Sequence, residues 1–356
     1  MTAADPLGLA GSDLAGYRVG GFLGDGAFAF VYAATSPSGE ERALKILNPR
    51  AGAQQILEFE NEGTLLLQLA HCSGVVEIFE SLDVPATVAQ AGGGTFSIRL
   101  RFHVLRRAAG SMDELAASAQ RLDWPSRLSL FRNVTLGVHQ AHLSDVVHRD
   151  LKCANCLLFL EGGSLTARLA DFGRSRSLSA PPAAHPMLYE WPRGDPVFAP
   201  PELLSGLGFD TPETHRCADL YGLGSLLFEL TFGQGITGLA LQPRMAVIDS
   251  TASLPALKRQ AAYAGQVSEI RGWYEPFFAA FENTCPGSIR GAAGALLRQL
   301  CDPDPSRRLP AVAPGRRAQR ANELQWLLRR VDSLRLALRN DIKQRQRLAI
   351  KKEGGG

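Results

Sequence analysis

Short runs of alternating apolar and polar residues, broken by glycine, dominate the first third of the chain. They predict strands over residues 17–26, 29–35, 41–47, 74–81 and 95–105. A helix is predicted over 53–70, because Ile56, Phe59, Leu66 and Leu69 recur at helical intervals. Residues 83–95, with a centre rich in alanine and glycine, are predicted to form a flexible hairpin tip.

After residue 108 the pattern changes to longer helical runs. Apolar residues that recur every three to four positions predict helices over 124–143, 218–232, 254–262 and 291–300. A strand-rich first part and a helix-rich second part are typical of an α+β architecture with a cleft between the parts. Residues 1–16 are small and polar, which predicts a loosely held lead-in.

The segment from 316 to 356 differs in charge from the rest of the chain. It contains twelve basic and four acidic residues, a net charge of +8, so the remainder carries −5 within the overall +3. A mildly acidic body with a basic appendage differs from a uniformly basic nucleic-acid-binding protein. Apolar residues step through this segment at the spacing of a helix stripe: Leu324, Leu327, Val331, Leu334 and Leu338.

Three interpretations of this basic segment remain open. The stripe could dock the helix on the body of the protein, with the charged face in solvent. It could instead join a second subunit, although the heptad pattern breaks at Asp341. The basic face could also attract an acidic protein, nucleic acid or anionic lipid.

The composition is that of a folded protein in a reducing compartment. Hydrophobic residues make up 45% and charged residues 21% of the chain. No apolar run reaches the ~18 residues of a transmembrane segment, and the first residues lack the features of a secretory signal. The six cysteines suggest no disulfide framework, and a redox or zinc role for Cys153 and Cys156 is disfavoured. We therefore expect a cytoplasmic location.

Two features of the strand-rich part are suited to binding phosphate. Gly24 and Gly26 lie at a strand–turn–strand junction, where missing side chains let phosphate oxygens approach backbone amides. Lys45 lies in an apolar strand and needs a counter-charge, because an unpaired ammonium is costly to bury. Three acids of the following helix qualify by distance alone: Glu58, Glu60 and Glu62. Neither feature decides the function alone, since a strand lysine can also extend its head into solvent.

The helix-rich part contains the residue types that phosphoryl transfer requires, in the sequences HRDLKCAN and DFG. The reaction needs an acceptor-only group near the incoming hydroxyl, which Asp150 can provide. It needs hard oxygen ligands for magnesium, which Asn155 and Asp171 can provide. Lys152 can supply a cation for the charge on the transferring phosphate.

Taken in order, these motifs resemble those of a protein kinase domain over the span 24–308. The resemblance implies a bilobal α+β protein kinase fold, with a small β-rich N-lobe that carries helix αC, a larger helical C-lobe and, in this chain, a C-terminal basic helix. The implied domains are a lead-in (1–16), an ATP-binding N-lobe (17–107), a C-lobe with the catalytic residues and substrate platform (108–312) and a basic helical tail (313–356).

The resemblance also implies roles for the motif residues. Glu62 would be the αC partner of Lys45, because the sequence from Glu62 to His71 is similar to the end of that helix. The implied catalytic residues are Asp150, Lys152, Lys45 and Glu62, and the implied Mg²⁺ ligands are Asn155 and Asp171. Glu202 would pair with Arg308, and Asp219 would brace the catalytic loop from below.

The implied ATP site combines the glycine-rich loop with an apolar adenine pocket. Its residues would be Gly24, Gly26, Ala29, Val31, Ala43, Lys45, Val104, Leu105 and Leu158. Ala29 replaces the third glycine of the family's loop, which should only stiffen it. The hinge between the lobes is placed near 104–107, with Val104 as the gatekeeper.

The function that the resemblance implies is an ATP- and Mg²⁺-dependent Ser/Thr protein kinase that acts on protein hydroxyls. The span from Asp171 to Glu202, which aminoglycoside phosphotransferases and similar small-molecule kinases lack, favours protein substrates. Lys152, two residues after Asp150, resembles Ser/Thr rather than Tyr kinases. The alternatives are a pseudokinase scaffold, which intact motif residues disfavour, and a protein whose basic tail acts under control of the kinase fold.

Two departures from the family pattern raise further questions. Asp195 stands where the family usually has a threonine, and either Lys152 bridges Asp150 and Asp195 or the Asp195 carboxylate turns to solvent. Arg149 precedes the catalytic aspartate, which in the family accompanies control by activation-loop phosphorylation. The nearest acceptors are Ser175, Ser177 and Ser179, although such a run is also typical of solvated coil.

Overall fold

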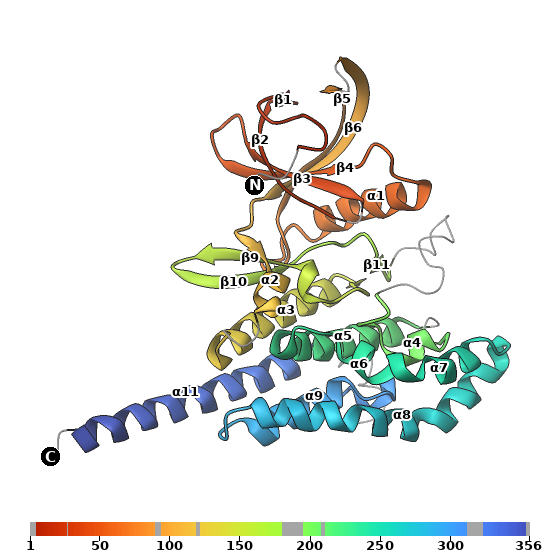
Figure 1. Cartoon of the computed structure of the whole chain (residues 1–356), viewed down its shortest axis with the longest axis vertical. Coiled ribbons are helices and arrows are strands. Elements are labelled where there is room, and N and C mark those ends of the chain that lie inside the picture. Colours follow the sequence, from red (N-terminus) through yellow and green to blue (C-terminus); the bar gives the residue numbers. More distant parts are fainter. Residues whose placement is uncertain are drawn as a thin grey trace.

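The computed structural model describes residues 5–26, 28–89, 94–118, 122–179, 195–207, 211–311 and 323–353. Within these residues the chain forms a sheet-rich lobe and a larger helical lobe, with the sheet above the helices in Figure 1. The predicted bilobal α+β fold is therefore confirmed. The predicted start of the tail, at 312–313, lies outside the described residues.

An antiparallel sheet in the order β1-β2-β3-β4-β6-β5 forms the small lobe. Its strands are β1 (Asp13–Leu14), β2 (Tyr17–Asp25), β3 (Ala29–Thr35), β4 (Glu41–Leu47), β5 (Ile78–Ala89) and β6 (Thr95–Arg106). The prediction of a loop from residue 83 is wrong, because β5 continues to residue 89. Pro85 is tolerated there since β5 is an edge strand, where a missing N–H breaks no ladder.

The first described residues pack against this sheet. The Asp5 carboxylate accepts hydrogen bonds from the Tyr32 hydroxyl at 2.5 Å and from the backbone of Ala10 at 2.8 Å. Leu7 and Leu9 are buried in the sheet core. The prediction of a loosely held lead-in is therefore wrong for residues 5–16. The small and polar character of the segment did not indicate that Leu7 and Leu9 would be buried or that Asp5 would bind backbone and Tyr32 groups.

Helix α1 (Ala53–Gln68) lies against the sheet (Figure 1) and carries three glutamates, Glu58, Glu60 and Glu62. The Phe59 ring stacks on the His103 ring of β6 with centroids 3.9 Å apart. Gly63 allows this close approach, because a Cβ there would lie 2.6 Å from the His103 ring. The helix is thus fixed in rotation, and with it the direction in which its acidic residues point.

The helical lobe surrounds α5, which is buried along most of its length. Its helices are α2 (Met112–Ala117), α3 (Trp124–Leu143), α4 (Pro201–Leu204), α5 (Pro212–Phe232), α6 (Ile236–Leu241), α7 (Met245–Ala252), α8 (Ala256–Thr284), α9 (Arg290–Leu300) and α11 (Gln325–Glu353). Short 3₁₀ turns cover Cys153–Asn155, Gln242–Arg244 and Pro305–Arg307. In the described part of the chain, no helix has the length and apolar character needed to span a membrane.

Two small sheets lie at the junction of the lobes. The first has the order β10-β9-β7, and the second pairs β11 with β8. Their strands are β7 (Gly110–Ser111), β8 (Val146–Val147), β9 (Cys156–Glu161), β10 (Ser164–Leu169) and β11 (Arg176–Ser177). They fix the ends of the two loops that carry the HRDLKCAN and DFG sequences.

The basic tail forms α11, which docks its apolar stripe on the body of the protein. Leu324, Leu327 and Val331 are fully buried, and Leu334 and Leu338 nearly so. The helix lies beside α3 (Figure 1), where Arg132 pairs with Asp332 at 2.6 Å. Docking is therefore confirmed, and the stripe is not free to join a second subunit.

A buried ion pair joins α4 to the end of the helical lobe. The two terminal nitrogens of Arg308 lie 2.6 and 2.7 Å from the two carboxylate oxygens of Glu202, as predicted. Arg308 is 0% exposed and also donates to the carbonyl oxygens of Asp302 and Cys217. Both charges are thus almost fully compensated by partners inside the protein.

Replacing Arg308 with methionine should destabilise the fold strongly, because it leaves the Glu202 carboxylate buried without its cation. We expect a loss of about 3–5 kcal/mol in the free energy of unfolding and a melting temperature lower by ~10 °C. The control is Arg345→Met, since Arg345 is 69% exposed in its pair with Asp341. Equal denaturation midpoints for the two variants would contradict the structural importance of the buried pair.

Candidate active site

Lys45 of β4 pairs with Glu62 of α1. The Lys45 ammonium nitrogen lies 2.7 and 2.6 Å from the two carboxylate oxygens, and Glu62 is buried. The two other acids that chain spacing allowed point elsewhere: Glu58 towards the DFG segment and Glu60 towards the outer face of the helix. The geometry thus agrees with the pairing that the family resemblance implied.

The electrostatics of this pair depend on a third charge, Asp171. Burial alone would lower the pKa of Lys45, but the attraction of Asp171 and Glu62 outweighs it and holds the pKa above its ordinary value. Burial raises the pKa of the Glu62 carboxyl to about 7, against the opposing attraction of Lys45. The lysine therefore stays charged, at a point between two acidic side chains from different elements.

A buried carboxylate of α5 holds the loop that follows β8. Asp219 accepts backbone hydrogen bonds from His148 and Arg149, both at 2.8 Å, and one from the His142 ring at 2.9 Å. Burial would raise its pKa, but these hydrogen bonds and the nearby imidazoles lower it instead. The predicted bracing of the loop by Asp219 is present in the structure.

Two residues of the site have left-handed backbone conformations that are costly for side-chain-bearing residues. The φ angle is 69° at Arg149 and 57° at Asp171. Such strain persists where surrounding contacts over-determine it, and it clusters at functional sites. The backbone of Arg149 is held by its hydrogen bond to the Asp219 carboxylate. The Asp171 side chain is held in part by Lys45, whose ammonium nitrogen lies 3.4 Å from the carboxylate.

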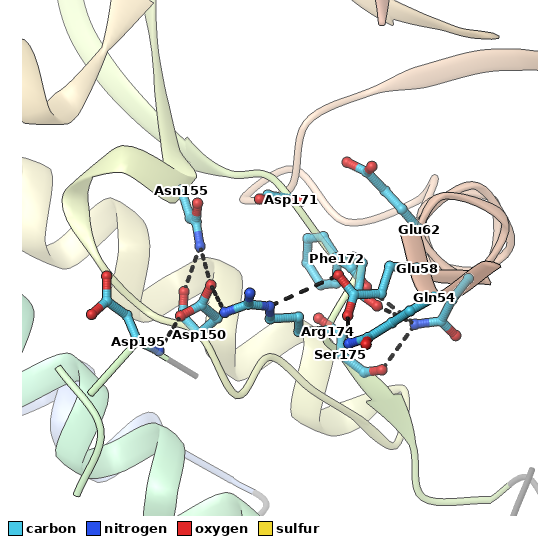
Figure 2. Close-up of polar contacts among 12 residues, drawn as sticks. Gln54, Glu58, Glu62, Asp150, Asn155, Asp171, Phe172, Arg174, Ser175 and Asp195 are labelled. Atoms are coloured by element: carbon cyan, nitrogen blue, oxygen red, sulfur yellow. Dashed lines mark hydrogen bonds and ion pairs between the residues drawn. The ribbon is translucent and has the colours of Figure 1, made fainter. Parts of the chain in front are cut away.

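Asp150 lies at the centre of a set of hydrogen-bond donors (Figure 2). The Asn155 amide donates to its backbone oxygen at 2.7 Å and to its carboxylate at 3.2 Å. The backbone N–H of Asp195 donates to the other carboxylate oxygen at 3.2 Å. Lys152 lies 3.8 Å from Asp150 and 3.2 Å from Asp195, which confirms the bridge and excludes the solvent-facing alternative for Asp195.

The donor set of Asn155 and Asp171 fits an ion that prefers oxygen ligands. Because the Asn155 amide nitrogen is turned to Asp150, its amide oxygen faces away from that carboxylate (Figure 2). The Asp171 side chain is 40% exposed, and Lys45 and His148 keep its pKa low although burial opposes them. The described residues contain no cluster of three or more metal-binding side chains. Two oxygen ligands suit Mg²⁺ that arrives with nucleotide phosphates.

Most of the residues predicted to bind nucleotide lie on four neighbouring strands of the large sheet, β2, β3, β4 and β6, whereas Gly26 follows β2 and Leu158 lies on β9 of a smaller sheet. In the register, Val31 is opposite both Gly24 and Lys45, and Ala43 is opposite Leu105. Val104 and Leu158 are buried, as are Ala29, Ala43 and Leu105. β6 ends at residue 106, within the predicted hinge.

The two loop glycines are not required by contacts within the protein. A Cβ at Gly24 would meet no atom within 4 Å, and one at Gly26 would lie 3.8 Å from the Ala29 carbonyl oxygen. Neither residue has a positive φ angle. Folding therefore does not explain why these two positions lack side chains. Their absence agrees with a surface on which phosphate oxygens approach the backbone amides.

The serines that follow the DFG sequence differ in accessibility. Ser175 is 3% exposed, and its hydroxyl donates to the His148 carbonyl oxygen at 3.1 Å, so it is not accessible to a kinase in this conformation. Ser177 and Ser179 are more exposed, with hydroxyl oxygens 3.1 Å apart. Only these two of the three predicted acceptors remain open to modification.

Cys153 and Cys156 are buried beside the catalytic loop. Burial raises the pKa of both thiols well above the ordinary value, and the nearby Glu229 carboxyl acts in the same direction. Glu229 accepts a hydrogen bond from the Cys153 backbone at 2.8 Å. The two cysteines are thus packing residues, as the sequence favoured.

Comparison with known proteins decides the family. The sequence model described as "Protein kinase domain" matches residues 17–326 of this chain. The chain belongs to the protein kinase domain family. Within this kinase domain, the match covers every element that contributes to the site and extends to the first turn of α11.

Relatives of this kinase domain include proteins from bacteria, plants and animals. It is 31% identical to "Serine/threonine-protein kinase PknJ" of Mycobacterium tuberculosis over 67% of this chain and 38% of the relative. It is 25% identical to "CBL-interacting serine/threonine-protein kinase 24" of Arabidopsis thaliana over 82% of this chain and 54% of the relative. It is 28% identical to human "Testis-specific serine/threonine-protein kinase 1" over 61% of this chain and 55% of the relative. The aligned region thus spans from just under two fifths to just over half of the length of these relatives.

Sequence reasoning missed two side chains that lie at this site, Asn61 and Arg174, and considered Glu58 only as a possible partner of Lys45. Glu58 and Asn61 share the inner face of α1 with Glu62, at positions four and one residue before it. Arg174 directly follows the DFG sequence. The helical spacing could have indicated the shared face, but not what that face contacts.

Replacing Asp195 with alanine should lower phosphoryl transfer to a protein acceptor, because Lys152 loses a partner 3.2 Å away. We expect kcat to fall by about 10-fold, which corresponds to ~1.4 kcal/mol of lost positioning. The KM for ATP should stay the same, since the nucleotide-binding strands are untouched. Asp249→Ala, at an exposed carboxylate of α7, is the control. If both variants transfer phosphate at the wild-type rate, the bridge has no catalytic role.

Proposed function

We propose that this kinase domain is an ATP- and Mg²⁺-dependent serine/threonine-protein kinase that transfers the γ-phosphate of ATP to protein hydroxyls. The observation that carries the proposal is the convergence of Lys45, Glu62, Asp150, Asn155 and Asp171 from four separate segments. Each has the chemical character that phosphoryl transfer needs, and none is replaced.

Each residue would contribute a separate part of the reaction. Lys45, held by Glu62, would bind nucleotide phosphate oxygens. Asp150 would orient the acceptor hydroxyl and take its proton, and Lys152 would offset charge on the γ-phosphate. Asn155 and Asp171 would hold Mg²⁺. When bound, the metal would offset the negative charge of the nucleotide phosphates.

Protein substrates and hydroxyl specificity are supported by two features. The span from Asp171 to Glu202 is long enough to form a substrate platform, and Glu202 is anchored to Arg308. Lys152 contacts both Asp150 and Asp195, at the place where Ser/Thr kinases have a lysine. The three relatives described above are named as serine/threonine-protein kinases.

The alternative function is a pseudokinase scaffold that binds nucleotide or partners without turnover. The intact ion pair of Lys45 and Glu62 and the accessible Asp171 carboxylate argue against it. Regulation by autophosphorylation would fall on Ser177 or Ser179, since Ser175 is buried. Arg149 precedes Asp150, as in kinases that are controlled in this way.

Asp150→Asn and Asp171→Ala should each abolish most transfer of radiolabelled phosphate from ATP to a generic acceptor protein. We expect a loss of about 10²- to 10⁴-fold for Asp150→Asn, the usual contribution of a positioned proton acceptor. Chelation of Mg²⁺ should stop transfer by the wild type, and Asp249→Asn should change nothing. Metal-independent transfer, or an unaffected Asp171→Ala variant, would refute the kinase proposal in favour of a scaffold.

The distal half of α11 is the part of the basic tail that remains available to partners. Beyond Ile342 the helix exposes the basic residues Lys343, Arg345 and Arg347, of which Arg345 also pairs with Asp341. We infer that this half attracts an acidic protein substrate. Removing the whole tail would uncover the buried stripe, so a truncation must spare it.

Removing residues 343–356 should therefore leave transfer to a basic acceptor such as histone unchanged and weaken transfer to an acidic acceptor such as casein. The reason is the loss of the basic residues after Ile342, whose attraction to an acidic protein is screened by salt. Initial rates with both acceptors at low and high ionic strength provide the measurement. Equal rates of casein transfer with and without the segment would remove the tail from substrate recruitment.

A further inference from the structure

Arg174, the residue after the DFG sequence, lies between two carboxylates from different parts of the fold. One terminal nitrogen is 3.6 Å from an Asp150 carboxylate oxygen, and its Nε is 3.9 Å from a Glu58 carboxylate oxygen. Figure 2 shows the side chain reaching from the Glu58 side towards Asp150. One arginine therefore joins the candidate proton acceptor of the catalytic loop to helix α1.

Glu58 is held inside the protein at the α1 end of this contact. Its side chain is 5% exposed and accepts a hydrogen bond from Gln54 of the same helix at 3.0 Å. A carboxylate at this depth is costly unless hydrogen bonds and a cation compensate it. Glu58 lies one helical turn before Glu62, so the two acids use the same inner face of α1.

The backbone from which Arg174 extends is fixed by that same face. The Asn61 side-chain amide lies 3.0 Å from the carbonyl oxygens of Gly173 and Ser175 and 3.3 Å from that of Phe172. A Cβ on Gly173 would lie 3.2 Å from the Glu58 carbonyl oxygen, so the two backbones are close together. Arg174 thus has little freedom to move independently of α1.

Asp150 is 8% exposed, and a carboxylate at this depth is costly unless a nearby cation or hydrogen bonds compensate its charge. Among the described residues, Lys152 and Arg174 are the two cations within 4 Å of its carboxylate. Under the proposed function Lys152 serves the γ-phosphate and is also engaged by Asp195. Arg174 is then the side chain that continues to balance and orient the Asp150 carboxylate.

We propose that Arg174 is a positioning residue that orients the Asp150 carboxylate towards the acceptor hydroxyl and makes this orientation depend on α1 through Glu58. The inference rests on the proposed kinase function. It extends the role of α1, because one face of this helix would position two groups of the site. Glu62 would position Lys45 for the nucleotide, and Glu58, through Arg174, would position the proton acceptor Asp150. A displaced α1 would then disable both halves of the site together.

Arg174→Gln should lower kcat by about 10- to 100-fold, as small misplacements of a catalytic group do, and leave the KM for ATP unchanged. Arg174→Lys should recover part of the loss, because it restores the charge without the planar fork. Steady-state kinetics with varied ATP and saturating acceptor protein measure both constants. A purely structural role would instead lower the melting temperature, which we expect to be the same as in the wild type.

Arg101→Gln is a closely matched control. Arg101 is 40% exposed against 39% for Arg174, and it too pairs with a glutamate of α1, Glu60, at 2.6 Å. Arg101 extends from β6 to Glu60 on the outer face of the helix and has no ion pair with Asp150. If Arg101→Gln lowers kcat as much as Arg174→Gln, the effect is a general one on α1, and the proposal is overturned.

A double-mutant cycle tests the dependence on α1. Glu58→Gln should lower kcat, and the Glu58→Gln, Arg174→Gln double variant should be no slower than Arg174→Gln alone, because both changes break one connection. Losses that multiply would show that the two residues act independently, which would overturn the proposed link.

Hydrogen–deuterium exchange makes the test independent of turnover. Amides over 148–156 should exchange faster in Arg174→Gln and in Glu58→Gln than in the wild type, and at the wild-type rate in Arg101→Gln. A wild type that transfers no phosphate but shows this pattern would refute the kinase function and retain the link between α1 and the loop. Unchanged exchange in both variants would refute the link itself.

Discussion

The site depends on a carboxylate that takes no part in the chemistry. Asp219 is buried in α5, and its charge is tolerated because two backbone N–H groups and the His142 ring donate to it. Those backbone groups belong to the two residues before Asp150, so compensating the buried charge also fixes the loop. Arg149 can keep its strained φ angle because these hydrogen bonds leave it no alternative. The core of the larger lobe thereby sets the position of the proton acceptor.

Helix α1 provides the second constraint, from the smaller lobe. Three positions of its inner face contact the DFG region in different ways: Glu62 by charge through Lys45, Asn61 by hydrogen bonds to carbonyl oxygens, and Glu58 by charge and close backbone packing. The ion pair of Glu58 with the partly exposed Arg174 contributes little on its own. Together the three contacts make the DFG backbone follow the helix, which in turn is fixed by the stacked rings of Phe59 and His103.

The elements that sequence predicted best are those whose ends carry their own signals. The helix over 124–143 was predicted from its periodicity with its observed bounds, and in the structure Asp123 caps it and Pro125 lies in its first turn. The helix predicted over 254–262 overlaps the start of α8, which begins at Ala256, runs for 29 residues and contains Pro276. A proline normally predicts the end of a helix. In addition, α8 has few buried positions, so its apolar residues show no clear helical periodicity.

The reaction centre was predictable as a set of residue types, but its connections were not. The spacing of three glutamates on α1 left the partner of Lys45 undecided, and only the family resemblance selected Glu62. Whether Asp195 faced Lys152 or solvent depended on the path of a loop that has no periodic pattern. Arg174 was invisible for the same reason: its importance comes from Asp150 and Glu58, which lie 24 and 116 positions away in the sequence. Local patterns predict elements and motif chemistry, whereas contacts of this kind exist only after both lobes have folded against each other.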